Sequence, residues 1–535
     1  MSRNISQTAV LVVGAGPTGL LLASELHRRG VPCHVIEAQA APLHWDRATV
    51  VHPRSLQIFE SLGLVEQFLT AGCRQRVIKI HSGGERLGTI DLADCGSIYG
   101  FNVGLSEEVT ESILTTYLQQ QGGQVNRSSR LIGMTTTPDN HVLADIEREG
   151  DRYQIEARWV VGCDGLHSAT RNFAGISFEG HDMLKPWAVF DASVEPWADT
   201  FEGTFVYLEA LPIILTAIPG HRWRVYLLPD SDHSDLVADA TSTLRVYDPS
   251  AHFVDIENPV RFRCHTRIAA KYRAGPIFLA GDAAHLCSPG EGHGMNCGLQ
   301  DAFNLGWKLA LVHQGTAHDA LLDSYEIERR PAAELVMKSG DEMEKTLNMA
   351  DPAQRKTRDA AIRTGLADPE VQHHDKVAET ELNIDYAHSP IVFGDANSSI
   401  AAGNRLPDNI PVRTSHGGPS SLHALGHHAG STLLLVGGPT ANPTALAALH
   451  ATLQQHVKGS TLFEAAVALT TGANGSGSIG RLDAVAASQL GMEGITLLAI
   501  RPDGYIGLRS DRDHLAALER YAACLTGMVD ARASL

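Results

Sequence analysis

A glycine-rich turn between an apolar strand and a helix stands near the start of the chain. Residues 8–13 (TAVLVV) form a β-branched apolar run, which is typical of a buried parallel strand. The stretch from Leu20 to Gly30 has helical periodicity and ends on a glycine. Between them the chain fits GxGxxG, with Gly14, Gly16, Pro17, Thr18 and Gly19 in order. Such glycines let the backbone turn tightly and approach a pyrophosphate at a helix N-terminus.

A second strand with a terminal carboxylate completes this unit. Residues 33–37 (CHVIE) form the expected strand, and Glu37 ends it. An acid at this place is positioned to bind the hydroxyls of an adenosine ribose. Because strand, turn, helix and acid occur in order, we favour a dinucleotide site over a purely structural turn. The acid favours an unphosphorylated ribose, as in FAD or NAD.

Two later segments repeat the pattern of a strand followed by a polar turn. Residues 159–171 (WVVGCDGLHSATR) place Asp164 after an apolar strand. Residues 277–296 (IFLAGDAAHLCSPGEGHGMN) place Asp282 at a strand end and then lead through three glycines into a long helix. The three segments together indicate a nucleotide-binding protein.

Composition excludes several other classes. The chain has 535 residues, which predicts two or three domains, and 43% of them are hydrophobic. A formal net charge of -18 without a long basic block argues against nucleic acid as a partner. Eight scattered cysteines without CxxC, and histidines without zinc spacing, predict no disulfide framework and no metal site. We expect a cytoplasmic protein with no membrane segment.

The rest of the chain changes character twice. Residues 179–272 contain short strands rich in β-branched and aromatic residues, which favour an antiparallel sheet. Near residues 395–410 the composition shifts to Asn, Ser, Gly and Pro, which we interpret as a domain boundary. Beyond it, residues 431–438 and 495–510 are expected strands, the second a hairpin that turns at Pro502-Asp503-Gly504, and a helix closes the chain.

The three nucleotide-binding segments resemble those of the group A flavoprotein monooxygenases, the aromatic hydroxylases built like p-hydroxybenzoate hydroxylase. The likeness covers about the first 350 residues and is strongest to the phenol and polyketide hydroxylase branch. It implies an α/β and α+β protein with a Rossmann-like FAD domain in two parts, an antiparallel-sheet substrate domain and a thioredoxin-like C-terminal domain. We place the two parts of the FAD domain at 1–178 and 273–395, the substrate domain at 179–272 and the thioredoxin-like domain at 396–535. The last segment lacks CxxC, so we expect a structural or interfacial role for it.

The resemblance also implies roles for single residues. Gly14 to Gly19 would hold the FAD pyrophosphate, Glu37 the ribose, and Asp282 the ribityl or pyrophosphate region. Backbone amides of Gly294, Met295 and Asn296 would face the flavin pyrimidine. Asp164 belongs to a motif associated with both FAD and the nicotinamide cofactor. The candidates for catalysis are Arg47, at the position of an arginine beside the isoalloxazine, and Pro289, which opens the loop through Gly292 to Gly294.

One position departs from the family. Glu107 stands where relatives have a Gln that contacts FAD, and a carboxylate near flavin would disfavour its anionic reduced form. Either the local geometry differs or a group such as Arg130 compensates. For the substrate pocket the middle sheet offers Tyr207, Thr216, Trp223 and Tyr226, although aromatic residues on a strand more often belong to the core.

The implied reaction uses NADH or NADPH and O2. Through a flavin C4a-hydroperoxide it would hydroxylate a small phenolic or polyketide-type aromatic substrate. The alternatives are a Baeyer-Villiger or epoxidising monooxygenase on the same fold, and a flavin-loaded protein that binds an aromatic compound without converting it. A homodimer stays open, and no general base can be named from the residues.

Overall fold

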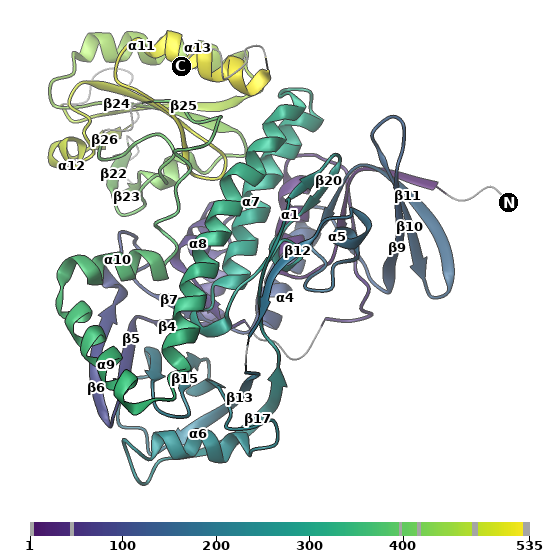
Figure 1. Cartoon of the computed structure of the whole chain (residues 1–535). Helices are drawn as coiled ribbons and strands as arrows, with labels where there is room; N and C mark the ends of the chain where they lie inside the picture. Colours follow the sequence, from purple (N-terminus) through teal and green to yellow (C-terminus); the bar gives the residue numbers. More distant parts are fainter. Residues whose placement is uncertain are drawn as a thin grey trace.

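The computed structural model describes residues 5–42, 48–183, 185–394, 398–414, 419–472 and 480–527. Figure 1 shows a central sheet-and-helix part, a second sheet below it and a third sheet above it, at the C-terminal end of the chain. The long helices α7 (His293–His313) and α8 (Asp323–Leu347) run through the middle. Within the described residues no helix is both long and apolar enough to cross a membrane.

The central sheet is built around β1 (Ile5–Val13), whose last five residues are buried. β1 pairs in parallel with β11 (Asp151–Gly162) on one side and β2 (Cys33–Ile36) on the other. The sheet order is β19-β20-β11-β1-β2-β8, with β9 and β10 extending it antiparallel from β11. The remaining strands are β8 (Val125–Asn126), β9 (Ser129–Thr136), β10 (Val142–Arg148), β19 (Arg273–Ala274) and β20 (Ile277–Leu279).

Helix α1 (Pro17–Arg28) follows β1 directly, and its proline occupies the first turn, where a missing N–H costs nothing. α1 and α7 pack together on the sheet, and their leucines belong to one large core. Between β2 and β8 the chain forms smaller elements: β3 (Val50–Val51), α2 (Pro53–Ser61), α3 (Val65–Ala71), β4 (Cys73–Gln75), β7 (Asn102–Gly104) and α4 (Glu107–Gln120).

The lower sheet has seven strands in the order β17-β13-β16-β15-β14-β5-β6. Five of them come from the segment 187–262, and neighbours among them are antiparallel, as the sequence predicts. β5 and β6 come from residues 77–91, and β5 joins β14 in parallel. The strands are β5 (Val77–Ser82), β6 (Glu85–Asp91), β13 (Trp187–Glu195), β14 (Gly203–Tyr207), β15 (Ile213–Ile218), β16 (Arg222–Leu227) and β17 (His252–Phe262).

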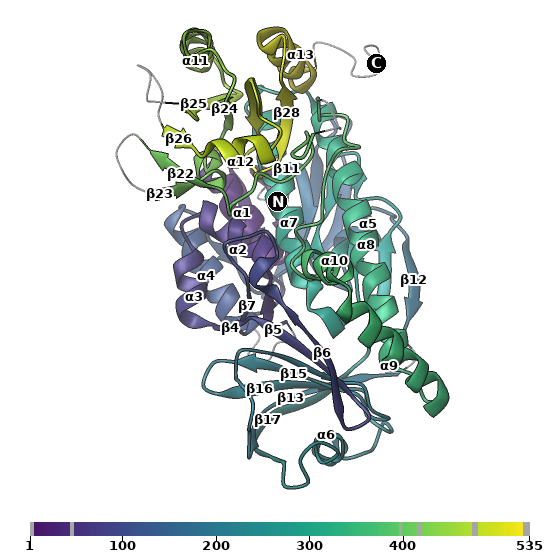
Figure 2. The ribbon, with the colours of Figure 1, turned by 90° about the vertical axis from the view of Figure 1, so that its left-hand side faces the viewer.

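Short elements connect the two sheets, and two helices cover the lower one. A three-stranded ladder, β12-β18-β21, lies between the central and lower sheets. Helices α9 (Pro352–Ala367) and α10 (Pro369–Glu379) pack beside β6 (Figure 2). The connecting elements are α5 (Ala169–Phe173), β12 (Phe178–Asp182), β18 (His265–Ala269) and β21 (His285–Leu286). Helix α6 (Leu236–Leu244) lies between β16 and β17 in the chain and packs on the lower sheet.

The C-terminal part has the thioredoxin-like order expected from the resemblance. β24 (Ser431–Gly437) is parallel to β25 (Phe463–Thr470) and antiparallel to β27 (Ile495–Ile500), which forms a hairpin with β28 (Ile506–Ser510). Helix α11 links β24 to β25, and α13 closes the chain beside β28 (Figure 2). The other bounds are α11 (Pro443–Lys458), β22 (Pro411–Thr414), β23 (Pro419–Ser421), β26 (Gly480–Leu482), α12 (Ala484–Gln489) and α13 (His514–Thr526). The fold class predicted from the sequence is confirmed.

Candidate functional site

A cavity of about 500 Å³ opens between the central and lower sheets. Its walls come from the β1–α1 turn, the segment after β20, the first turn of α7 and strand β16. The first three of these places lie in the first and third sequence motifs, and the second motif adds the wall residues Cys163, Gly165, Leu166 and His167. The predicted site residues that line the cavity are Gly16, Pro17, Thr18, Asp282, Pro289, Gly292, Gly294 and Met295.

The glycines of the first turn are required by close backbone contacts. Gly14 has φ +103°, and a Cβ there would meet the carbonyl oxygen of Cys163 at 2.2 Å. A Cβ on Gly19 would meet the carbonyl oxygen of Gly14 at 2.1 Å. Gly14 and Gly19 therefore shape the turn from behind the cavity, whereas Gly16 faces it. The free N–H groups of the first turn of α1 open toward the same space.

Glu37 lies behind this turn. Its carboxylate accepts hydrogen bonds from the backbone N–H groups of Ala15 at 2.9 Å and Gln39 at 2.8 Å. The contact with Ala15 ties the end of β2 to the glycine-rich turn. Glu37 itself is not part of the cavity wall. It is thus held at the turn, with each oxygen keeping a lone pair for a ribose hydroxyl.

Asp164 lies at the N-terminal end of a short helix, α5, whose N-cap is Ser168. Its carboxylate accepts from Ser168 Oγ at 2.5 Å and from Thr170 N at 2.9 Å, which are the start of α5. The carboxylate does not line the cavity, although residues on either side of it do. Asp164 therefore shapes the 163–167 turn that forms part of the wall.

Asp282 and α1 approach each other closely at the cavity. Asp282 lies in a single turn of 3-10 helix after β20, with an exposed side chain. Its neighbour Gly281 has φ +59°, and a Cβ there would meet Thr18 Oγ1 at 2.6 Å. This close approach places the turn that carries Asp282 next to the first turn of α1, and both line the cavity.

The first turn of α7 presents backbone to the cavity. Gly292 caps the helix in the left-handed conformation, with φ +71°, and Gly294 and Met295 line the wall. The N–H groups of this turn have no partner within the helix, so they can receive negative charge. The Asn296 side chain points away from the cavity and is buried; it accepts from His52 N at 2.9 Å and donates to the carbonyl of Val50 at 2.8 Å. Asn296 therefore anchors the helix start to β3 and α2.

Three further candidates have different outcomes. Arg47 lies outside the described residues. Pro289 begins a turn of 3-10 helix, Pro289–Glu291, that borders the cavity. Glu107 lines the cavity as the first residue of α4, and the N–H of Ala48 approaches its carboxylate at 3.5 Å. Arg130 is exposed on β9 and is not part of the cavity wall.

Of the four middle-sheet residues, the structure places Tyr226 in the cavity wall. Its hydroxyl lies 2.9 Å from Thr49 Oγ1, which joins the lower sheet to the central part. Trp223, three residues earlier on β16, points to the opposite face and packs in the lower core with Tyr207. The candidates Tyr207, Thr216 and Trp223 do not line this cavity. Strand alternation turns Tyr207 and Trp223 to the opposite face, whereas Thr216 pairs with Arg224 and so shares the face of Tyr226 outside the cavity wall.

The sequence motifs missed one wall and a second cavity. Phe262, Arg263, Cys264 and His265 line the first cavity from the β17–β18 connection, where no motif marks them. A second cavity of about 460 Å³ shares Leu166, His167 and His265 with the first. Its lining also includes Arg171 and Arg267 and contains no carboxylate.

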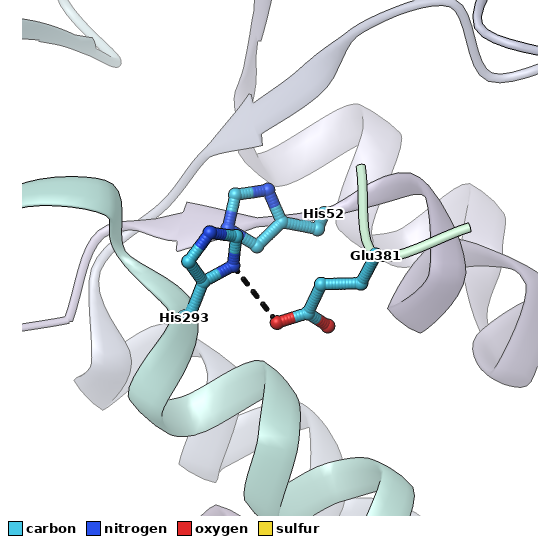
Figure 3. Close-up of side chains that lie close together, drawn as sticks. All are labelled: His52, His293 and Glu381. Atoms are coloured by element: carbon cyan, nitrogen blue, oxygen red, sulfur yellow. Dashed lines mark hydrogen bonds and ion pairs between the residues drawn. The ribbon is translucent and has the colours of Figure 1, made fainter. Parts of the chain in front are cut away.

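Next to the cavity lies a buried polar cluster of His52, His293 and Glu381 (Figure 3). His293 Nδ1 lies 2.9 Å from Glu381 Oε1, and the two imidazole rings are 4.7 Å apart. Metal ligation was not expected from the sequence. In the part of the chain that the structure describes, three such groups bring potential ligand atoms together: His52 with His293 and Glu381, Glu60 with His423 and His427, and His285 with Cys297 and Asp301.

Several known proteins are similar to this chain in sequence or in structure. The model of the family described as FAD binding domain matches residues 7–339. Pentachlorophenol 4-monooxygenase of Sphingobium chlorophenolicum is 32% identical over 348 residues, 62% of this chain but 63% of that protein, which is less than two thirds of its length. 6-Methylpretetramide 4-monooxygenase of Streptomyces rimosus is 30% identical over 409 residues, 73% of this chain and 72% of that protein. The structure of anhydrotetracycline hydroxylase from Streptomyces rimosus aligns at TM-score 0.75 and 26% identity, covering 97% of this chain and 99% of that one.

Proposed function

The chain belongs to the FAD binding domain family, and from this premise we propose that it is an FAD-dependent monooxygenase. It takes electrons from NADH or NADPH and uses O2 to hydroxylate a phenolic or polyketide-type aromatic substrate. The observation that carries the proposal is the single cavity that joins the β1–α1 turn, Asp282, the first turn of α7 and Tyr226. The relatives named above are aromatic monooxygenases and hydroxylases, which supports this reaction class.

The residues present fit an FAD molecule. The N-terminus of α1 faces the cavity at Gly16, Pro17 and Thr18, where N–H groups and the helix dipole suit a pyrophosphate. Glu37 is held at the same turn for the adenosine ribose. The first turn of α7 offers backbone amides to the flavin pyrimidine. FAD, when bound there, supplies the transfer of electrons to O2 and of oxygen to the substrate.

The chain itself orients the substrate and keeps water away. Tyr226, Phe262, Leu286 and Met295 give the cavity an apolar side beside the α7 turn. An aromatic ring that lies against these side chains displaces water from the reacting region. The bond between Tyr226 and Thr49 fixes the tyrosine hydroxyl at the junction of the two sheets. We propose that this hydroxyl orients the phenolic oxygen of the substrate.

The second cavity suits the electron donor. The side chains of His167, Arg171, His265 and Arg267 surround it, and arginine is well suited to the oxygens of a pyrophosphate. The cavity meets the first one at residues 166, 167 and 265, so a dinucleotide lying in it would have one end beside the flavin site. We propose it as the NADH or NADPH site.

All eight cysteines are free thiols, which supports a reducing compartment such as the cytoplasm.

The first prediction is substrate-dependent turnover. The purified protein should show a bound-flavin spectrum, and phenols, naphthoquinones or polyketide aromatics should stimulate its oxidation of NADH or NADPH. One such compound should yield a product heavier by a single oxygen atom, measured by mass spectrometry. A ring hydroxyl in that product supports hydroxylation, whereas a lactone or epoxide would assign it to the alternative oxygenations.

Two results would contradict the proposal. A protein that cannot be reconstituted with FAD would remove its basis. Bound FAD with tight aromatic binding, but no stimulated oxidation across the panel, would favour a flavin-loaded binding protein. An Arg267→Gln variant serves as a matched probe of the donor site, since we expect it to raise the KM for the nicotinamide cofactor without changing the flavin spectrum.

A further inference from the structure

The first residue of α7 carries a buried ion pair. His293 Nδ1 lies 2.9 Å from Glu381 Oε1, and the side chains are only 6% and 1% exposed. His293 is flanked by Gly292 and Gly294, both of which line the main cavity. Figure 3 shows the imidazole at the start of the helix with the Glu381 carboxylate facing it from a separate segment. The pair therefore lies directly behind the turn that faces the cavity.

Glu381 adopts a backbone conformation that a glutamate rarely takes. It lies just after α10 and the capping residue Thr380, and its φ is +56°. Helices commonly end on a residue in this left-handed conformation, and that residue is usually glycine because it has no Cβ. A strained residue that persists where glycine would serve points to a role for its side chain.

The surroundings of the pair are polar and closed. Gln300, also on α7, donates from Nε2 to the second oxygen of Glu381. The His52 ring lies against that of His293 in a tilted arrangement, with ring centroids 4.7 Å apart, and His52 Nδ1 lies 3.1 Å from Asn102 Oδ1. The side-chain amide of Asn102 in turn donates to Glu379 Oε1 at 3.1 Å. Two turns of α7 are thus tied to the end of α10.

One charge in this cluster is positive. Burial would lower the pKa of His293, but its hydrogen bond to Glu381 and the charges of Glu381, Glu291 and Glu379 raise it to about 10. Burial and the charge of His293 lower the pKa of His52 to about 4, so His52 is neutral. A fixed imidazolium therefore lies one residue from the cavity wall, with its counter-charge on the side of α10.

We propose that the His293–Glu381 pair is a positioning site for the cofactor. It fixes the first turn of α7 against the flavin and places a positive charge behind that turn. The inference rests on the proposed function insofar as the ligand is FAD. Because α9 and α10 pack on β6, the pair also connects the cofactor turn to the lower sheet.

Three variants test the proposal in the full-length holoprotein. In His293→Gln the positive charge is lost, so reduced flavin is less stabilised and the midpoint potential should fall. In Glu381→Gln at pH 6, the Glu291 carboxylate, 3.9 Å from His293 Nε2, still favours the charged imidazole, so the potential should rise. Each shift is expected to reach about 30 mV, which is tenfold in relative affinity for a two-electron couple. A purely structural role would not move the potential in opposite directions.

Glu381→Gly covers the case in which the glutamine variants fold poorly. Glycine suits the left-handed backbone, so the variant should be at least as stable as the natural chain. If Glu381 positions the turn, FAD should nevertheless bind about tenfold more weakly, measured by quenching of flavin fluorescence. The matched controls are Glu149→Gln and Glu149→Gly, at an exposed turn residue with φ +53°.

The possible outcomes separate the two proposals. A natural protein that takes up no FAD would overturn the proposed function and this inference together. Bound FAD whose affinity and potential are unchanged in all three variants would overturn this inference alone. So would a stoichiometric divalent metal that both glutamine variants lose, since the two histidines and Glu381 would then be ligands.

Discussion

Some ionisable residues in this protein lie where burial makes their charged form energetically unfavourable. Glu379, at the end of α10, is partly buried, and its carboxyl group accepts a hydrogen bond from Asn102. Burial raises the pKa of Glu379 to about 7, although the positive charge of His293 opposes the shift. The folded protein therefore binds a proton at Glu379 more tightly than the unfolded chain does. Stability gained this way is present below the unfolded pKa of about 4.5 and is lost as the pH rises through 7.

A Glu379→Gln variant should remove the free-energy cost of ionising this buried carboxyl group. Glutamine keeps an oxygen that accepts from Asn102 but cannot ionise. We expect the variant to match the natural protein near pH 4 and to exceed its stability by about 1 to 3 kcal/mol above pH 7. Urea unfolding between pH 4 and 8 measures the difference. Parallel curves at all pH values, as expected for the exposed control Glu149→Gln, would contradict the assigned pKa.

At the scale of an element, the β1–α1 turn depends on space as well as on backbone conformation. Gly14 and Gly30 both have positive φ, +103° and +71°. A Cβ on Gly14 would overlap the backbone of Cys163 at 2.2 Å, whereas a Cβ on Gly30 meets nothing within 4 Å. Substitution at these two positions therefore distinguishes the free-energy cost of a left-handed backbone conformation from that of a steric overlap.

Alanine at the two positions should therefore have unequal effects. Gly30→Ala introduces backbone strain alone, which should lower the free energy of unfolding by about 1 kcal/mol. Gly14→Ala adds a collision with β11 that moves the turn, so we expect a loss of about 3 kcal/mol or more, together with loss of FAD binding. Thermal unfolding and flavin content measure both effects. Equal destabilisation in the two variants would show that the contact with Cys163 is not tight.

At the scale of the whole molecule, one arginine holds the C-terminal part to the cofactor domain. Arg501 is fully buried and bonds to both oxygens of Glu328 on α8, at 2.7 and 2.8 Å, and to Asp503 beside it. Asp503 Oδ2 accepts from Trp307 on α7 at 3.0 Å. Lys308 also pairs with Glu328, at 2.7 Å. The turn that begins at Pro502 is thus inserted between the two long helices, which supports an interfacial role for this domain.

Removal of Arg501 should destabilise the whole chain. In Arg501→Met the buried Glu328 loses its main partner, and breaking such a pair costs about 3 to 5 kcal/mol. The matched control is Arg363→Met, since the pair of Arg363 with Glu85 is exposed and should be worth about 1 kcal/mol or less. Denaturant unfolding compares them, and limited proteolysis near residue 396 reports release of the C-terminal part. Equal losses in the two variants would mean that the buried cluster does not dock the domain.

The sequence alone determined the features that are local to the chain. The strand, glycine turn, helix and second strand at residues 5–36 follow from apolar runs and glycine spacing, and so do the strands before Asp164 and Asp282. The hairpin at Pro502-Asp503-Gly504 is equally local, because turn residues and alternating apolar residues specify it. These segments carried the family resemblance, so the fold class and many of the residues that line the main cavity could be predicted from them.

Only the tertiary structure decided which distant segments meet. Strand alternation puts Trp223 and Tyr226 on opposite faces, but packing decides that the tyrosine faces the cavity. Residues 77–91 join the lower sheet through a parallel contact with β14, which no local pattern marks. The pairs His293–Glu381 and Arg501–Glu328 join residues 88 and 173 positions apart. The physical reason is that propensity and periodicity act over a few residues, whereas buried charges find partners only when the elements that carry them are packed together.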